Sequence, residues 1–233
     1  MWCGADGLTR PSSRCARGRF APSGPPLMSN VRSLVQRPEM LLFDLGGVLV
    51  DNVAFERLSA TPGVGMNETE IKSRWLTSST VRSFELGAIS PEVFAKNFVN
   101  EWSLPVEPEV FLAEFASWPK GFYPGALELL ARLRRQSKVG CLSNSNSVHW
   151  DRLGSLGEHF DVALSSHLLE AIKPDALCFE RALRECGASR QHVAFFDDSL
   201  ENVVAAREFG IQAFHVCGLA QVNRALVQSG WLQ

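Results

Sequence analysis

The feature that most constrains the fold is an alternation of short apolar runs with longer amphipathic runs between residues 123 and 216. Four short runs fit strands: residues 138–142, 160–164, 193–196 and 211–216. An earlier run, residues 40–43, has four apolar residues, which are too few for a helix and fit a buried strand. Strands that alternate with helices favour a parallel sheet covered on both faces, so the sequence predicts a doubly wound α/β fold.

Three of the predicted strands end in polar residues, and a lysine follows in a later loop. These residues are Asp44, the pair Ser143 and Asn144, the pair Asp197 and Asp198, and Lys173. Ligands of open α/β sheets bind beyond the carboxyl ends of the strands, so we expect these side chains at one edge. Taken singly, each has an ordinary alternative: a turn cap or turn former for the Asp, Ser and Asn residues, and a solvated side chain for the lysine.

Together these residue types suit a phosphoryl group and a magnesium ion. Carboxylate oxygens are ligands of Mg²⁺, which also bridges to phosphate. The adjacent acids Asp197 and Asp198 repel each other unless a cation lies between them. A lysine and a hydroxyl stabilise charge on a transferring group, and a carboxylate can attack phosphorus to give an aspartyl-phosphate.

Between the first two polar clusters the pattern turns helical after Asp51 and stays so until about Lys120. Asn67 and Glu70 have the spacing of a capping box. The pairs Ser90-Pro91 and Glu107-Pro108 mark two further helix starts. Aromatic residues at helical spacing predict the core of a small bundle. We therefore expect an all-helical cap at 54–119 lying over a core formed by 39–53 and 120–233, and Glu85 of the cap is a candidate substrate contact.

Composition argues against nucleic-acid binding, a membrane span and a disulfide framework. The chain has 233 residues and a net charge of −2, so no basic field indicates nucleic acid, and no apolar run is long enough for a membrane span. The six cysteines form no C-x-x-C pair, which favours reduced thiols. We expect a cytoplasmic protein, a monomer or homodimer.

The first 38 residues differ from the rest. They carry six arginines and a single acid, Asp6, together with many Ser, Pro and Gly residues. Such a stretch cannot bury enough surface to fold alone, so we expect a disordered leader. An extended or mis-assigned start, with Met28 as the true start, is the favoured interpretation. The alternative is that residues 1–27 are an organelle transit peptide.

The four polar clusters, in their order from Asp44 to Asn202, resemble the motifs of the haloacid dehalogenase-like (HAD) superfamily, whose members are mostly Mg²⁺-dependent phosphatases. The insertion between the first two motifs resembles a type-1 helical cap. The first motif, Phe43-Asp44-Leu45-Gly46-Gly47-Val48, is similar to the sugar-phosphate phosphatase branch that includes a bacterial glucose-1-phosphatase. The resemblance implies a Rossmann-like core and a small phosphorylated metabolite as substrate.

The resemblance also implies a role for each motif residue. Asp44 matches the nucleophile and a metal ligand, and the main-chain carbonyl of Gly46 matches a second ligand. Ser143 matches the phosphate-binding hydroxyl, with the Asn144 amide beside it, and Lys173 the lysine that pairs nucleophile and phosphate. Asp198 matches the acidic metal ligand, Asp197 a second acid on the ion or behind it, and Asn202 an aspartate of many relatives.

Gly46 is a departure, because the family usually has there an aspartate that protonates the leaving oxygen and then activates water. Such help contributes roughly 10²–10⁴-fold. Two hypotheses follow: the protein is a non-catalytic phosphoryl-binding pseudo-phosphatase, or its substrate has a good leaving group, as in a sugar 1-phosphate. A metal-independent haloacid dehalogenase-type hydrolase is a further alternative, against which the acidic pair Asp197-Asp198 argues.

Overall fold

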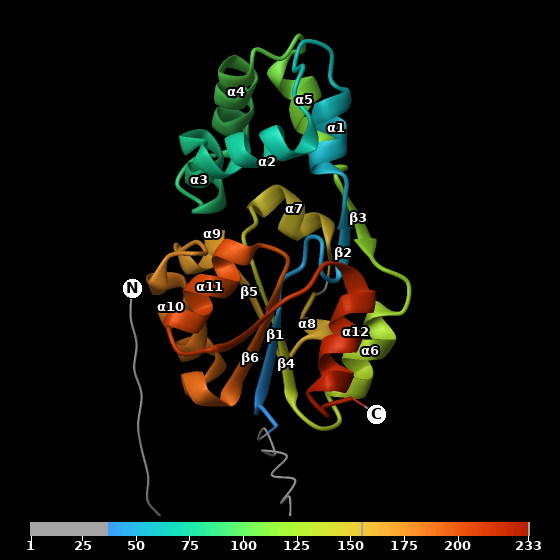
Figure 1. Cartoon of the computed structure of the whole chain (residues 1–233). Helices are drawn as coiled ribbons and strands as arrows, with labels where there is room; N and C mark the ends of the chain where they lie inside the picture. The colour runs from blue at the N-terminus through green and yellow to red at the C-terminus, as the bar shows by residue number, and fades with distance from the viewer. Residues whose placement is uncertain (1–36, 155, 233) are drawn as a thin grey trace, which may run out of the picture. The chain divides into compact units, whose positions relative to one another are not determined.

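The computed structural model describes residues 37–154 and 156–232, and its core is a five-stranded parallel sheet (Figure 1). The strand order is β5-β4-β1-β6-β7. The strands are β1 (Met40–Phe43), β4 (Lys138–Ser143), β5 (Val162–Ser165), β6 (Val193–Asp197) and β7 (Gln212–His215). All neighbouring pairs are parallel, so their carboxyl ends share one edge. This confirms the predicted doubly wound α/β fold.

Helices cover both faces of this sheet because successive strand residues alternate between two apolar layers. In β1, Leu41 and Phe43 pack into one layer, and Met40 and Leu42 into the other. The first layer also holds side chains of α6 (Ala126–Leu133), α8 (Leu156–His159) and α12 (Gly218–Gln228). The second holds side chains of α9 (Ser166–Leu169), α10 (Ala176–Cys186) and α11 (Leu200–Glu208). A short 3₁₀ helix, Arg190–His192, precedes β6.

Five helices between β1 and β4 form a third apolar cluster of their own. They are α1 (Ala54–Ala60), α2 (Glu68–Thr77), α3 (Ser79–Glu85), α4 (Pro91–Trp102) and α5 (Pro108–Phe115). The predicted aromatic stripes pack together there, for example Phe84 on Phe94 with ring centroids 4.2 Å apart. The capping box of Asn67 and Glu70 is present at the start of α2. All five helices fall inside the segment 54–119 that we interpret as the cap.

The ends of this helical segment differ from the expectation. Residues Val50–Asn52 form β2, which pairs antiparallel with β3 (Pro119–Phe122), so a two-stranded ribbon joins the helices to the core. The expected helical pattern from Asn52 to Lys120 is therefore wrong at both ends. Neither strand alternates in hydrophobicity, and β3 contains a proline and a glycine, so only pairing across the chain forms the ribbon.

Other boundaries also differ. The strand expected at 160–164 begins at Val162, and two short helices, α7 (Ser147–Arg152) and α8, precede it. Helix α9 has no counterpart among the predicted elements. Cys141, Cys178 and Cys186 are free and buried, as expected of reduced thiols in apolar stretches, whereas Cys217 is free but exposed. Residues 1–36 of the predicted leader, with Cys3 and Cys15, lie outside the described residues. No helix among those described is both long and apolar enough to span a bilayer.

Candidate active site

Asp44 stands at the carboxyl end of the central strand β1, where the chain makes a tight turn. The main-chain N–H of Asp44 donates to the Phe196 carbonyl at 2.8 Å, which extends the ladder with β6 by one residue. After it, the N–H of Val50 donates to the Leu45 carbonyl at 2.7 Å, and the N–H of Gly47 donates to the Val50 carbonyl at 3.0 Å. The turn holds the Asp44 carboxylate, which is buried, at the mouth of the sheet.

Gly47 explains why this turn needs glycine. Its φ of +71° lies in the left-handed region that favours glycine, and a Cβ there would lie 3.0 Å from Asp198 Oδ2. The turn thus packs directly against the carboxylate of Asp198. Gly46, by contrast, has room for a Cβ, whose nearest heavy atom would be Asn52 Nδ2 at 3.9 Å.

Lys173 is the centre of the charged cluster. It is buried, and its Nζ donates to Asp44 Oδ1 at 2.9 Å, to Asp197 Oδ2 at 2.7 Å and to the Leu142 carbonyl at 2.8 Å. These three acceptors satisfy the three N–H donors of an ammonium group. Lys173 therefore holds the carboxylates that follow β1 and end β6 together from the loop between α9 and α10.

The two adjacent acids after β6 have different surroundings. Asp197 is fully buried and accepts four hydrogen bonds, from Lys173, from the Ser199 N–H at 2.7 Å and twice from Asn202 Nδ2 at 3.1 Å. Asp198 is partly exposed, and its Oδ2 lies 3.6 Å from Nζ of Lys72. One carboxylate oxygen from each of Asp44, Asp197 and Asp198 lies within 4.8 Å of the others, which is close enough to share a cation.

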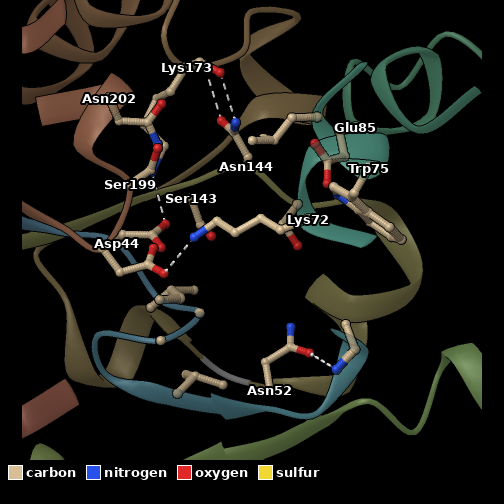
Figure 2. Close-up of a pocket in the computed structure, with 18 of the residues that line it drawn as sticks. Asp44, Asn52, Lys72, Trp75, Glu85, Ser143, Asn144, Lys173, Ser199 and Asn202 are labelled. Atoms are coloured by element: carbon tan, nitrogen blue, oxygen red, sulfur yellow. Dashed lines mark hydrogen bonds and ion pairs between the residues drawn. The ribbon is translucent and has the colours of Figure 1, made fainter. Parts of the chain in front are cut away.

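Ser143 and Asn144 follow β4 at the same edge. Ser143 is buried and lines the cavity above Asp44. The side chain of Asn144 bonds to the main chain of Lys173 in both directions: Nδ2 donates to the Lys173 carbonyl and Oδ1 accepts from the Lys173 N–H, each at 2.9 Å (Figure 2). Asn144 therefore fixes the loop that carries the lysine.

A cavity of about 520 Å³ joins these core residues to the helical segment. Its helical wall includes Phe55, Glu68, Lys72, Trp75 and Glu85. Figure 2 shows Glu85 and Trp75 on the side of the cavity away from Asp44, with the Lys72 side chain reaching across it. Sequence reasoning singles out Glu85 but misses Lys72, whose partner Asp198 is distant in the chain, and the lining role of Trp75, whose spacing places it in the aromatic core.

Burial is the largest influence on the pKa values of the two shifted acids in the site, and the charge of a nearby lysine is the second. Burial raises the pKa of Asp44 to about 7, opposed by the charge of Lys173 and aided by Asp197 and Asp198. Burial opposes the charge of Lys173, but Asp197 and Asp44 outweigh it and raise the pKa of Lys173 above its usual value. Burial also raises the pKa of Asp198, against the charge of Lys72. A bound cation would stabilise the ionised carboxylates of such a site.

Glu85 and His149 titrate abnormally at the edges of the cavity. Burial raises the pKa of Glu85 to about 7, partly offset by a hydrogen bond from Trp75 and by the charge of Lys173. Burial lowers the pKa of His149 to about 4, so the ring is neutral at neutral pH. His149 stacks on Phe115 with centroids 4.0 Å apart, as expected for a residue with a packing role.

Comparison with known proteins gives the family. The family model of haloacid dehalogenase-like hydrolases matches residues 39–210, about three quarters of the chain. A phosphatase of Mycobacterium tuberculosis is 27% identical over 199 residues, 81% of this chain and 91% of that protein. The phosphoglycolate phosphatase of Nitrosococcus oceani is 26% identical over 201 residues, 77% of this chain and 84% of that protein.

The fold also matches a solved structure. A HAD family enzyme from Bacteroides thetaiotaomicron, crystallised with magnesium and inorganic phosphate, superposes with a TM-score of 0.62 at 24% identity, over 76% of this chain and 93% of that one. The sheet order, the buried Asp–Lys–Asp cluster at its edge and the family match agree. The chain belongs to the haloacid dehalogenase-like hydrolase family.

Proposed function

We propose that this hydrolase is a Mg²⁺-dependent phosphatase that cleaves a small phosphate monoester through an aspartyl-phosphate on Asp44. The observation that carries the proposal is the cluster of Asp44, Lys173, Asp197 and Asp198 at the floor of a cavity closed by the helical segment. Two relatives that are phosphatases, and the magnesium and phosphate in a structural neighbour, support it.

The residues that would hold Mg²⁺ follow from their remaining acceptors. Asp198 and Asp44 each keep an oxygen with few protein partners, and the main-chain carbonyl of Gly46 is the third ligand that the family resemblance implies. Asp197 has four hydrogen bonds already, so its role in the proposal is to anchor Lys173 behind the ion. When bound, Mg²⁺ offsets negative charge on the phosphoryl oxygens.

The chain's own residues carry the covalent steps. Lys173 fixes Asp44 Oδ1, which leaves the other oxygen to form a bond to phosphorus while the bond to the leaving oxygen breaks. Ser143 and the charge of Lys173 stabilise the transferring group. Water then attacks phosphorus, the bond to Asp44 breaks and inorganic phosphate leaves. Asn144 keeps Lys173 in place throughout.

A small sugar phosphate is the substrate class that we propose. The cavity volume of about 520 Å³ suits a phosphorylated metabolite. Its helical wall combines the rings of Trp75 and Phe55 with the charged groups of Lys72 and Glu85, which suits a polar ligand with an apolar face. A sugar 1-phosphate fits the absence of an acid at Gly46, because an anomeric oxygen leaves more easily than an ordinary alkoxide.

The test is turnover of p-nitrophenyl phosphate by the full chain with MgCl₂. We expect Asp44→Asn to lower kcat by ~10³-fold or more, as loss of a covalent nucleophile does. Asp51→Asn, an exposed carboxylate on β2, is the matched control and keeps the wild-type rate. A panel of sugar 1-phosphates and 6-phosphates then defines the substrate.

Each rival has its own signature in the same assay. Absence of turnover with every phosphate ester, together with tight binding of inorganic phosphate, would support the pseudo-phosphatase. Hydrolysis of a 2-haloacid that survives EDTA would support the dehalogenase-type reaction. Metal-dependent turnover that Asp44→Asn removes contradicts both.

A further inference from the structure

We propose that Glu85, on the helical segment, is the general acid and base that Gly46 cannot supply. The inference rests on the proposed phosphatase function and extends it to the protons of the two steps. It makes a good leaving group unnecessary, so it widens the substrate class from sugar 1-phosphates to ordinary alkyl phosphates.

The position of Glu85 fits this role. Attack by Asp44 needs the leaving oxygen in line behind phosphorus, on the far side from Asp44. Water that later attacks the aspartyl-phosphate arrives at the same position. Glu85 lines the same cavity as Asp44 and Ser143, and Figure 2 shows it on the opposite side from Asp44. One carboxyl group there can therefore serve both steps.

The surroundings of Glu85 favour the protonated acid. Its side chain is partly buried, and it accepts a hydrogen bond from the Trp75 indole. Glu85 is also the last residue of α3, where the helix dipole disfavours a negative charge. Its pKa of about 7 is in the range that suits a group which must first give and then take a proton at neutral pH.

The proton balance is complete without another reactant. As the phosphorus–oxygen bond breaks, the leaving oxygen takes the Glu85 proton and departs as an alcohol. The Glu85 carboxylate then takes a proton from the attacking water. The water oxygen bonds to phosphorus at the same time, and the bond between phosphorus and Asp44 breaks. The charged groups around Glu85 are Arg82 on α3, Lys72 on α2, and Asp44 and Lys173 in the core. The titratable residue His167 lies on α9, a helix that contacts α3.

The first test is leaving-group dependence in Glu85→Gln. With phenyl phosphate, whose leaving group needs a proton, we expect kcat/KM to fall by ~10²-fold or more. With p-nitrophenyl phosphate, whose leaving group does not, kcat/KM stays within a few-fold of wild type. Glu114→Gln, an exposed carboxylate on α5 that does not line the cavity, is the matched control and leaves the ratio unchanged. Equal losses on both substrates, or none, would overturn the assignment.

The second test separates this inference from the proposed function. Glu85→Gln lacks the base for water attack, so p-nitrophenolate appears in a burst of one per active enzyme, followed by slow turnover. A wild-type enzyme without Asp44-dependent turnover contradicts the phosphatase proposal itself. A wild-type enzyme that turns over, with a Glu85→Gln variant that keeps its steady-state rate, contradicts only the role of Glu85.

The pH profile and a rescue complete the design. Wild-type kcat/KM on phenyl phosphate falls above about pH 7 as Glu85 loses its proton, and Glu85→Gln lacks this limb. Gly46→Asp, which adds an acid where a Cβ would have no heavy atom nearer than 3.9 Å, is expected to restore the rate of Glu85→Gln. Should Glu85→Gln not fold, Glu85→Asp replaces it, with a smaller loss and the limb retained. A limb that persists in Glu85→Gln would refute the proposal.

Discussion

At the scale of single residues, Asp197 and Asp198 are neighbours in sequence with opposite tasks. Asp197 is buried among hydrogen-bond donors and accepts a hydrogen bond from Lys173. Asp198 lines the cavity, and its ion-pair partner is Lys72, which is distant in the sequence and 3.6 Å away. A buried charge that loses its partner is costly, while an exposed pair contributes little. The same substitution at the two positions should therefore affect different properties.

We expect Asp197→Asn to lower the free energy of unfolding by on the order of 3 kcal/mol, because Lys173 loses a buried counter-charge. Asp198→Asn should change it by less than about 1 kcal/mol in metal-free buffer. Mg²⁺ should raise the Tm of wild type but not that of Asp198→Asn. Urea denaturation and thermal scans with and without MgCl₂ measure both effects. Equal destabilisation by the two variants would contradict the division of roles.

The site residues at the strand ends can be predicted from the sequence, because the topology of a parallel sheet brings those ends to one edge. Asp44, Ser143 and Asp198 need only an apolar run followed by a polar residue to be noticed. The hydrogen bonds of Asn144 to the Lys173 main chain and of Asn202 to Asp197 could not be foreseen. Both depend on how loops pack, as does the pairing of Lys72 with Asp198.

At the scale of elements, local signals predict best. The capping box before α2 and the Ser-Pro start of α4 are made by residues a few positions apart, so the sequence contains the whole signal. The ribbon of β2 and β3 pairs segments about seventy residues apart and leaves no local pattern. Helix α7 packs His149 against Phe115 and Trp118, which lie just before β3 in the chain.

His149 on α7 makes stability depend on pH. Its Nε2 lies 2.8 Å from the Phe115 carbonyl at the end of α5, and burial lowers its pKa to about 4. The unfolded chain binds a proton near pH 6.5, whereas the folded protein does not. The free energy of unfolding is therefore highest with respect to His149 above about pH 6.5. It falls by roughly 3 kcal/mol as the pH drops from 6.5 towards 4, because the unfolded chain binds the proton first.

His149→Gln should be less stable than wild type at pH 7, by about 1–2 kcal/mol, because the stacked ring is lost. Between pH 6.5 and pH 4.5 its stability should fall less than that of wild type, so the two curves converge. The carboxylates of the site titrate in both proteins and cancel in the comparison. Urea midpoints at several pH values measure the difference; parallel curves would show that His149 does not titrate in this way.

At the scale of the whole described chain, the helical segment and the sheet are joined by more than the ribbon. Arg82 on α3 forms an ion pair with Asp175 before α10, and Lys72 on α2 with Asp198. Because Glu85 lies on α3 beside Arg82, contacts that hold α3 against the core also hold the proposed acid over Asp44. In the proposed mechanism, this arrangement links substrate capture to proton transfer.

Asp175→Asn should weaken this closure without touching the reacting groups. Both side chains of the Arg82–Asp175 pair are about half exposed, so the pair contributes about 0.2–1 kcal/mol to closure. We expect KM for a phosphate ester to rise by up to about five-fold. The rise should shrink at high salt, where the wild-type pair is already screened.

Glu114→Gln is the matched control, because Glu114 pairs with Arg57 inside the helical segment at a similar exposure and does not bridge to the core. Its KM should equal that of wild type, whereas Asp175→Asn should differ from both at low salt. Steady-state kinetics at two salt concentrations make the comparison. If both variants raise KM equally, the effect comes from net charge, and the Arg82–Asp175 contact has no special part in closing the helical segment over the sheet.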